Sequence, residues 1–215
     1  MRVFSNLAGL ACAAAILAAC SSGGNHPSFQ TAGVIAPPSQ CNIVPTSFGS
    51  AEPLRAFSEG NGCGIGNPWR SYSIANVNFS QPAEMNCGMS APLDDWLQNA
   101  VQPAAQRAFG EAVVAVDVLA SYSCRPRNNQ RGARLSEHGL GNAIDIGAFT
   151  LQSGRKVNVE HGWFGSSSES SFLRNVRAYA CNDFMTVLGP GSDYEHRNHI
   201  HLDLEVRRNG NHYCH

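Results

Sequence analysis

The eight cysteines of this 215-residue chain constrain its fold most strongly. The first two, Cys12 and Cys20, lie in or close to an apolar segment near the N-terminus. Residues 7–17 form a run of apolar and small side chains that is too short to span a membrane and is typical of an export signal. Exported chains fold in an oxidising compartment, where cysteines form disulfides. If Cys12 leaves with the signal and Cys20 becomes the new N-terminus, an even set remains for disulfide formation: Cys41, Cys63, Cys87, Cys124, Cys181 and Cys214.

The end of the apolar run carries a second signal. The sequence Leu17-Ala18-Ala19-Cys20 resembles the lipobox of bacterial lipoproteins, which implies cleavage after residue 19 and a lipid on Cys20. By the same resemblance, Ser21 in place of aspartate implies sorting to the outer membrane and action in the periplasm. An ordinary secretory signal that happens to end near Cys20 is the alternative. Both interpretations take the mature chain out of the cytoplasm.

The cysteine spacings do not determine the pairing. Six cysteines allow about 15 pairings. The intervals are long and irregular with no C-x-x-C pair, which disfavours a cysteine-type zinc site and a thioredoxin-like motif. We expect Cys124 to pair with Cys181, because both lie in the half of the chain that carries the candidate chemistry.

Composition divides the rest of the chain into two parts. Residues 21–40 are rich in Ser, Gly and Pro and lack an apolar period, so we predict a flexible tether that follows the signal of residues 1–19 and the lipidated Cys20. Residues 41–215 are long enough for one domain with a sizeable core. The formal net charge of -1 argues against nucleic-acid binding. The N-terminal lipid is the only expected contact with a membrane.

Periodicity predicts short elements of both kinds. Alternation at residues 72–79 predicts a short strand, and apolar side chains three and four apart predict a helix that begins at Ser90, kinks at Pro103 and ends at Gly110. The other expected elements are strands at residues 111–123, 143–149, 184–188 and 199–206 and a helix over residues 172–180. This order predicts an α+β fold, with a mostly antiparallel central sheet flanked by a few helices, rich in loops and stapled by disulfides.

The sequence HIHLDLEV at residues 199–206 alternates polar and apolar positions. A strand here would place His199, His201, Asp203 and Glu205 on one face and the apolar side chains on the other. Side chains two positions apart on a strand lie about 6.5–7 Å apart, so both histidines can address one small site. One of them can bind a metal while the other performs a different task.

A third histidine and a carboxylate stand upstream, in SEHGLGNAID at residues 136–145. Asp145 falls within a predicted apolar strand, where an unpaired carboxylate is costly, so a cation partner is expected. His138 precedes it, with intervening glycines that permit a tight turn. Alone, His138 would be a loop histidine and Asp145 a hydrogen-bonded buried carboxylate. Together with the later histidines, they favour a zinc site with three protein ligands and a position for water.

These residues carry a family resemblance. The pattern S-x-H-x-x-G-x-A-x-D at residues 136–145, followed by H-x-H at residues 199–201, resembles the LAS superfamily of zinc peptidases, VanX and MepA types included. Those enzymes cleave peptidoglycan peptides that contain D-amino acids. From about Cys41 onward, the chain also resembles the bacterial extensin-like C-terminal domain family. The resemblance implies a zinc-dependent peptidase that acts on peptidoglycan stem peptides or crosslinks, as an endopeptidase or a carboxypeptidase.

The resemblance also assigns roles to single residues. It implies His138, Asp145 and His201 as zinc ligands, with water at the fourth position. His199 would be the general base or a hydrogen-bond partner of the transition state, and His196 a second polar residue of the site. Ser136 would orient the loop or a ligand.

Two positions bear on whether the chain is active. Arg125 resembles an arginine that stabilises the developing oxyanion, and a solvated loop arginine is the alternative. The neighbouring Arg127, Arg131 and Arg134 would either bind substrate carboxylates or be solvated. In the VanX type a glutamate three residues before the last ligand is the base, whereas this chain has Asn198. Either His199 takes that role, or the protein is an inactive zinc-containing lipoprotein that binds or scaffolds peptidoglycan.

Overall fold

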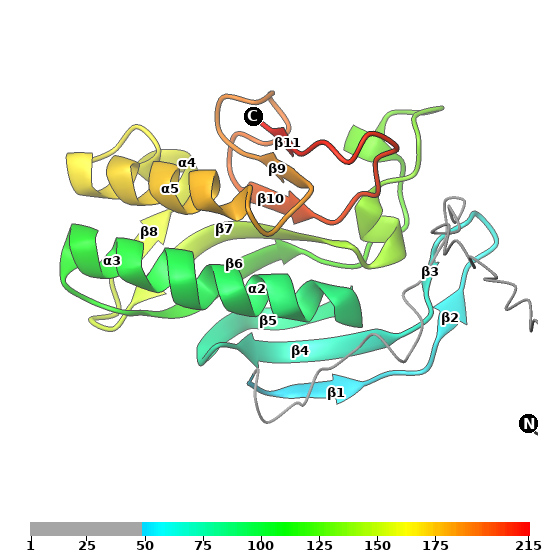
Figure 1. The fold of residues 1–215 in the computed structure, drawn as a ribbon, viewed down its shortest axis with the longest axis horizontal. Coiled ribbons are helices and arrows are strands. Elements are labelled where there is room, and N and C mark those ends of the chain that lie inside the picture. The colour runs from blue at the N-terminus through cyan, green and yellow to red at the C-terminus, as the bar shows by residue number, and fades with distance from the viewer. Residues whose placement is uncertain (1–48) are drawn as a thin grey trace, which may run out of the picture. The chain divides into compact units, whose positions relative to one another are not determined.

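The computed structural model describes residues 49–215 (Figure 1). Residues 1–48, which include the predicted export signal, Cys20, the predicted tether and Cys41, lie outside the described residues, so the predictions made for them stay predictions. Within residues 49–215, no helix is both long enough and apolar enough to cross a membrane.

A sheet forms the centre of the described domain (Figure 1). Its strands are β1 (Ala51–Pro53), β4 (Pro68–Ile74), β5 (Val77–Asn86), β6 (Val113–Ala120), β7 (Ala143–Leu151), β8 (Lys156–Asn158), β9 (Thr186–Leu188), β10 (Ile200–Asp203) and β11 (Tyr213–Cys214). They follow the order β1-β4-β5-β6-β7-β10-β9-β11, and β8 pairs with β7. Within residues 49–215, the strand pairs are antiparallel except β5 with β6 and β9 with β11. A separate ribbon pairs β2 (Phe57–Ser58) with β3 (Gly64–Ile65).

The helices cover one face of this sheet (Figure 1). They are α2 (Ser90–Trp96), the π-helical η3 (Leu97–Val101), α3 (Gln102–Phe109), α4 (Val159–Gly162) and α5 (Ser167–Ala180), with short 3-10 turns at η2 (Cys87–Met89), η4 (Arg127–Asn129) and η5 (Glu137–Leu140). Strands and helices that do not alternate regularly make this an α+β fold, which confirms the expected class.

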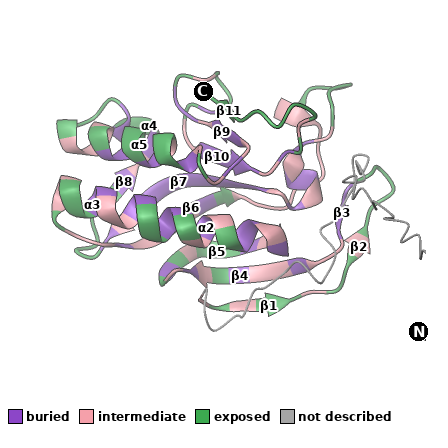
Figure 2. Ribbon diagram, in the orientation of Figure 1, coloured by how far each residue is buried: buried purple, intermediate pink, exposed green. Residues whose placement is uncertain are grey.

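The core lies between the helices and the sheet (Figure 2). Trp96 of α2 packs against Phe149 of β7 and Phe184, with ring centroids 6.1 and 6.5 Å apart. Its indole N–H donates a hydrogen bond of 2.8 Å to the carbonyl of Val176 in α5, so this one side chain ties two helices to the sheet.

Strand β7 carries core side chains on one face and a polar side chain on the other. Ile144 and Ile146 belong to the core beneath the helices. Successive side chains on a strand point to opposite faces, so Asp145 between them faces away from the helices. In the same way His201 lies between the core residues Ile200 and Leu202. The polar side chains of the two strands therefore share the face opposite helices α2, α3 and α5.

Local geometry corrects one sequence expectation in the first half of the domain and refines another. Residues 72–79 form parts of two strands rather than one, because Ala75 and Asn76 turn the chain with φ of 53° and 60°. The helix expected to start at Ser90 is α2, which begins at that residue, but Ser90 does not cap it. The cap belongs to the preceding turn η2, where the Asn86 side chain accepts a hydrogen bond from the Gly88 N–H.

The end of this helix follows the sequence more closely. The irregularity expected at Pro103 is the π-helical segment η3 that directly precedes α3, a looser turn than a regular helix has. Gly110, with φ of 70°, ends α3 as predicted.

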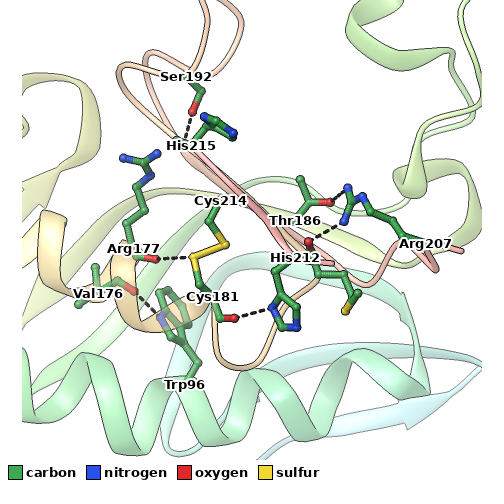
Figure 3. The surroundings of a disulfide bond; sticks show 11 residues. Trp96, Val176, Arg177, Cys181, Thr186, Ser192, Arg207, His212, Cys214 and His215 are labelled. Atoms are coloured by element: carbon green, nitrogen blue, oxygen red, sulfur yellow. Dashed lines mark hydrogen bonds between the residues drawn. A yellow bond between two sulfur atoms is a disulfide. The ribbon is translucent and has the colours of Figure 1, made fainter. Parts of the chain in front are cut away.

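The predicted disulfide Cys124–Cys181 is wrong. Cys63 pairs with Cys124. Cys181 pairs with Cys214, as Figure 3 shows. Cys181 ends helix α5, and the parallel pairing of β11 with β9 brings Cys214 to it, whereas Cys124 follows β6 and meets the loop before β3. Cys87 is disulfide-bonded as well.

Candidate metal centre

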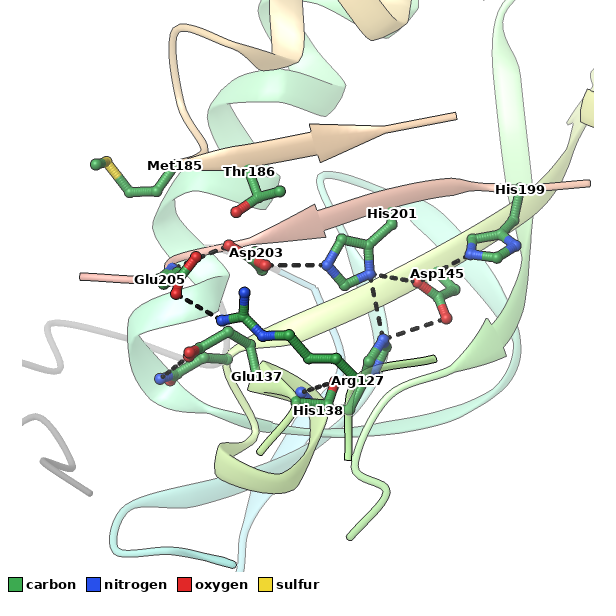
Figure 4. A network of polar contacts seen from close by, with 12 residues as sticks. Arg127, Glu137, His138, Asp145, Met185, Thr186, His199, His201, Asp203 and Glu205 are labelled. Atoms are coloured by element: carbon green, nitrogen blue, oxygen red, sulfur yellow. Dashed lines mark hydrogen bonds and ion pairs between the residues drawn. The ribbon is translucent and has the colours of Figure 1, made fainter. Parts of the chain in front are cut away.

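Three buried side chains converge on the face of the sheet opposite the helices (Figure 4). Asp145 in β7 and His201 in β10 are direct cross-strand partners, and the turn η5 carries His138 to them. One potential ligand atom from each side chain lies within 4.8 Å of the others. These residues are the predicted ligand set, and together they form a cluster that could hold a metal ion.

The hydrogen bonds of His138 determine which of its ring nitrogens is available. Its Nδ1 lies 2.6 Å from the carbonyl oxygen of Ser121, which can only accept, so Nδ1 carries the proton. Its Nε2 lies 3.2 Å from Asp145 Oδ2 and 3.2 Å from His201 Nδ1. The ring therefore directs its metal-binding nitrogen into the cluster.

His201 is oriented by a carboxylate on each side (Figure 4). Its Nδ1 lies 2.8 Å from Asp145 Oδ1 and its Nε2 lies 3.0 Å from Asp203 Oδ2. Asp203 is thus the outer partner that fixes the ring, and Nδ1 is the nitrogen turned toward His138 and Asp145. A carboxylate behind a metal-binding histidine is a common arrangement in metal centres.

The charges of these side chains depend on one another. Burial alone raises the pKa of Asp145, but the adjacent His138 and His201 hold that pKa well below its usual value, so the carboxylate is ionised. Burial lowers the pKa of His201, but Asp145 and Asp203 raise it by more, so its pKa lies above the usual value. The imidazolium of His201 supplies the positive charge that this buried carboxylate pair requires, and a cation bound at Nδ1 would take the place of the proton there.

Two more histidines border the cluster. His199 Nδ1 lies 2.8 Å from Asn198 Oδ1, which leaves its Nε2 facing Asp145 Oδ1 at 3.5 Å. Burial, together with the neighbouring histidines, outweighs the charge of Asp145 and lowers the pKa of His199 to about 4. The ring is therefore neutral at neutral pH, and Nε2 can accept a proton.

His196 completes the group. Its Nδ1 lies 2.6 Å from Asp193 Oδ1, and its ring centroid lies 5.2 Å from that of His199 and 5.5 Å from that of His201. All four histidines named from the sequence therefore lie at one place, with His196 oriented by a carboxylate that the sequence analysis did not single out.

Ser136 and Arg125 lie at the edge of the cluster. Ser136 caps η5 through a 3.4 Å hydrogen bond from the His138 N–H, and its own N–H donates to the Arg125 carbonyl at 3.1 Å. Ser136 thus holds the turn that carries His138. Arg125 borders the cavity described below, and its guanidinium forms no ion pair with any residue of the described range 49–215.

Asp203 and Glu205 lie beside the cluster with partners that the sequence does not reveal. Glu205 is buried, its N–H donates to Asp203 Oδ1 at 2.9 Å, and its carboxylate binds Arg127 and Arg207 at 2.5 Å each. The alternation of residues 199–206 had placed both acids on the face of His201. What it lacked was any indication of their partners, which come from distant segments.

A cavity of about 280 Å³ opens over the cluster. Its lining combines the histidines with basic, acidic and amide side chains, and Leu188 and Tyr213 supply apolar surface. Burial raises the pKa of Glu137 at its edge. The mixture of charges and amides suits a polar ligand such as a peptide.

One comparison with known proteins identifies the family. The model of the family described as extensin-like protein C-terminus matches residues 39–215. The chain belongs to this family. No curated protein and no solved structure matches the chain.

The extensin-like domain therefore presents two distinct sets of groups on the sheet face opposite the helices of the core. One set comprises the inward-facing donor atoms of His138, Asp145 and His201. The other comprises the Nε2 atoms of His199 and His196, which the bonds of Nδ1 to Asn198 and Asp193 leave available. Such an arrangement can hold a cation and can accept or return a proton beside it.

Proposed function

We propose that this extensin-like domain is a zinc-dependent peptidase that hydrolyses peptide bonds of peptidoglycan stem peptides or crosslinks. The observation that carries the proposal is the orientation of the three histidine rings. His138 directs Nε2 and His201 directs Nδ1 toward an ionised Asp145, while His199 keeps a free Nε2 beside them. The resemblance to the LAS superfamily supplies the substrate class.

Two imidazole nitrogens and one carboxylate form a donor set that suits zinc in hydrolytic sites. Zinc bound there would polarise a peptide carbonyl and acidify a bound water. Asp203 and the Ser121 carbonyl would hold the two ligand rings in place.

The remaining chemistry belongs to side chains of the chain itself. Nε2 of His199 accepts the proton of the attacking water, since its Nδ1 is committed to Asn198. His196, held by Asp193, returns a proton to the leaving amine. Arg125 at the cavity edge stabilises the developing oxyanion. No covalent intermediate with the chain is required.

The location is part of the same proposal. Lipidation at Cys20 would anchor the protein to the outer membrane through the tether of residues 21–40, so that the catalytic domain reaches periplasmic peptidoglycan. The lipid would be the only membrane contact.

Asn198 favours a second candidate function. It stands where the VanX type has a glutamate base, which is the departure expected of a zinc-containing lipoprotein that binds or scaffolds peptidoglycan without turnover. The hydrogen bond between Asn198 Oδ1 and His199 Nδ1 argues for turnover instead, because it orients His199 so that its Nε2 can act as the base in place of a glutamate.

Metal analysis combined with a digestion assay tests the proposal. Purified mature protein is analysed for metal by mass spectrometry and incubated with crosslinked muropeptides, with and without chelator, before chromatography. We expect about one zinc per chain and chelator-sensitive loss of crosslinked or full-length species, whose products identify the bond. Zinc with untouched muropeptides would favour the binding protein, and a chain without metal affinity would refute both functions.

A further inference from the structure

Residues 126–135 form a loop, here called the cavity loop, that is fixed at both ends. A bridge between Pro126 and Leu135 closes it, and the Arg127 N–H donates to the Arg134 carbonyl at 2.9 Å. The Arg127 guanidinium binds the buried Glu205 at 2.5 Å, which fastens the loop to the segment after β10. The disulfide Cys63–Cys124 anchors the chain two residues before this loop begins.

The tip of the cavity loop has an unusual backbone. Asn128 and Asn129 have φ of 53° and 54°, in the left-handed region that side chains rarely adopt. Among the non-glycine residues of the described range, positive φ values otherwise occur only at Ala75 and Asn76, in the turn between β4 and β5. Asparagine adopts this region more readily than other non-glycine residues, and such backbone often occurs where a loop presents groups to a ligand.

Both asparagines line the cavity over the metal cluster. Neither side-chain amide forms a hydrogen bond with a residue of the range 49–215, although the backbone of the loop is well bonded within itself. Each amide therefore keeps two N–H donors and a carbonyl acceptor for a ligand. These groups match the alternating C=O and N–H groups of an extended peptide, and they carry no charge that would demand a charged partner.

We propose that Asn128 and Asn129 are peptide-binding residues, whose side-chain amides hydrogen bond the main chain of a substrate that lies in the cavity. This inference rests on the proposed function for its substrate class and deepens it by naming residues that position the peptide. The fixed cavity loop explains how two solvent-accessible amides can bind, because Arg127 and Glu205 have already ordered the backbone that presents them. Asn128 and Asn129 would bind and position the peptide, whereas the metal cluster would act on the peptide bond that is cleaved.

Binding is measured apart from turnover. The full chain carrying His199→Ala, which blocks turnover while leaving the three metal ligands in place, is titrated with a purified crosslinked muropeptide dimer by calorimetry. Asn128→Gly and Asn129→Gly are then added singly and together. Glycine accepts positive φ without strain, so these changes remove the amides and keep the backbone. Each lost hydrogen bond should raise Kd about 3- to 10-fold.

A matched control separates backbone effects from binding. Asn76 has the same left-handed backbone, with φ of 60°, and does not line the cavity. Asn76→Gly should leave Kd unchanged while changing Tm as the other two substitutions do. Asn128→Asp retains an acceptor and loses both donors, so it should weaken binding wherever the asparagine donates to a peptide carbonyl.

Two outcomes would overturn the inference: a Kd that Asn128→Gly and Asn129→Gly leave unchanged, or a parent chain that binds no muropeptide. The proposed function fails separately, if the chain with His199 intact binds the muropeptide and never cleaves it. In that event the two asparagines remain the peptide contacts of a binding protein.

Discussion

His199 stands next to the metal cluster without belonging to it, and its expected role follows from that position. Its Nε2 lies 3.5 Å from Asp145 Oδ1, and its Nδ1 is held by Asn198. A side chain that accepts a proton and binds no metal should be separable from the ligands by mutation. The first two predictions concern single side chains of this kind.

His199→Ala should lower kcat for muropeptide hydrolysis by about 10²–10⁴-fold, the usual contribution of a general base, and leave the zinc content unchanged. His138→Ala should remove zinc and activity together, because it deletes a ligand. The measurements are metal analysis and steady-state kinetics on the same preparations. His161, an exposed residue that does not line the cavity, provides the control in His161→Ala. Loss of zinc from His199→Ala would make His199 a ligand and refute its assignment.

Asp203→Asn should weaken zinc binding about 10- to 100-fold, because the neutral amide orients His201 less strongly than the carboxylate that accepts from Nε2 at 3.0 Å. The variant keeps the shape of the side chain, so the effect is measured as zinc affinity against a competing chromophoric chelator. Asp193→Asn is the counterpart, since Asp193 holds His196 and not a ligand. It should reduce activity with zinc affinity intact. Equal zinc affinities for parent and Asp203→Asn would show that Asp203 does not position the ligand.

Among the elements, the turn η5 matters most, because it brings His138 to two strands. Gly141 ends this turn with φ of 66°, and a Cβ there would lie 2.4 Å from Ile65 Cδ1 and 2.9 Å from the Asn86 backbone nitrogen. The turn therefore depends on a glycine for both conformation and space.

Gly141→Ala should lower the free energy of unfolding by about 2–4 kcal/mol, the sum of the left-handed backbone cost and the steric overlap. Chemical denaturation measures this loss. Gly154→Ala is the matched control, since Gly154 has φ of 87° but a Cβ there would meet no atom within 4 Å. It should cost only about 1 kcal/mol. A similar loss in both variants would mean that the packing against Ile65 and Asn86 does not matter.

The places where helices and strands end show how well elements can be predicted from the sequence. The helix end at Gly110 was predicted because a glycine after an apolar period is a local signal. The cap at Asn86 was missed because η2 precedes the apolar period, and Ser90 looked like the first capping residue. The turn at Ala75 and Asn76 was missed because alanine gives no sign of a left-handed conformation.

For the whole molecule, stability should respond to pH through a carboxylate pair between two packed helices. Burial, and then the charge of Asp95 in α2, raise the pKa of Asp183 after α5 from 3.8 to about 6. Between these values the unfolded chain has lost the proton that the native chain keeps. The free energy of unfolding therefore falls as pH rises from about 4 to about 6, and the penalty is complete above that range.

Asp183→Asn should remove this penalty. A shift of this size corresponds to at most about 3 kcal/mol, and because Asp183 is partly exposed, solvent screening reduces the expected gain to about 1 kcal/mol at pH 7. Below pH 4 the gain should vanish. Thermal unfolding of parent and variant at both pH values, in chelator so that metal binding does not contribute, measures the difference. Asp95→Asn should give a smaller gain, because the burial of Asp183 remains, and a gain from Asp183→Asn that is the same at pH 3.5 and 7 would contradict the mechanism.

The sequence by itself determined the local features of this protein. Alternation in residues 199–206 put His199, His201, Asp203 and Glu205 on one side, and the glycines between His138 and Asp145 allowed the turn that the structure contains. These features depend on periodicities of two residues or on the conformation of single residues, so a short stretch of sequence is enough to recognise them.

Only the tertiary structure decided which distant groups meet. The pairing of Cys63 with Cys124 and of Cys181 with Cys214, the choice of Nδ1 on His201, and the attachment of the cavity loop through Arg127 and Glu205 all depend on the strand order β7-β10-β9-β11. The physical reason is that contacts between remote segments follow from how the whole core packs, and no local pattern in the chain encodes them.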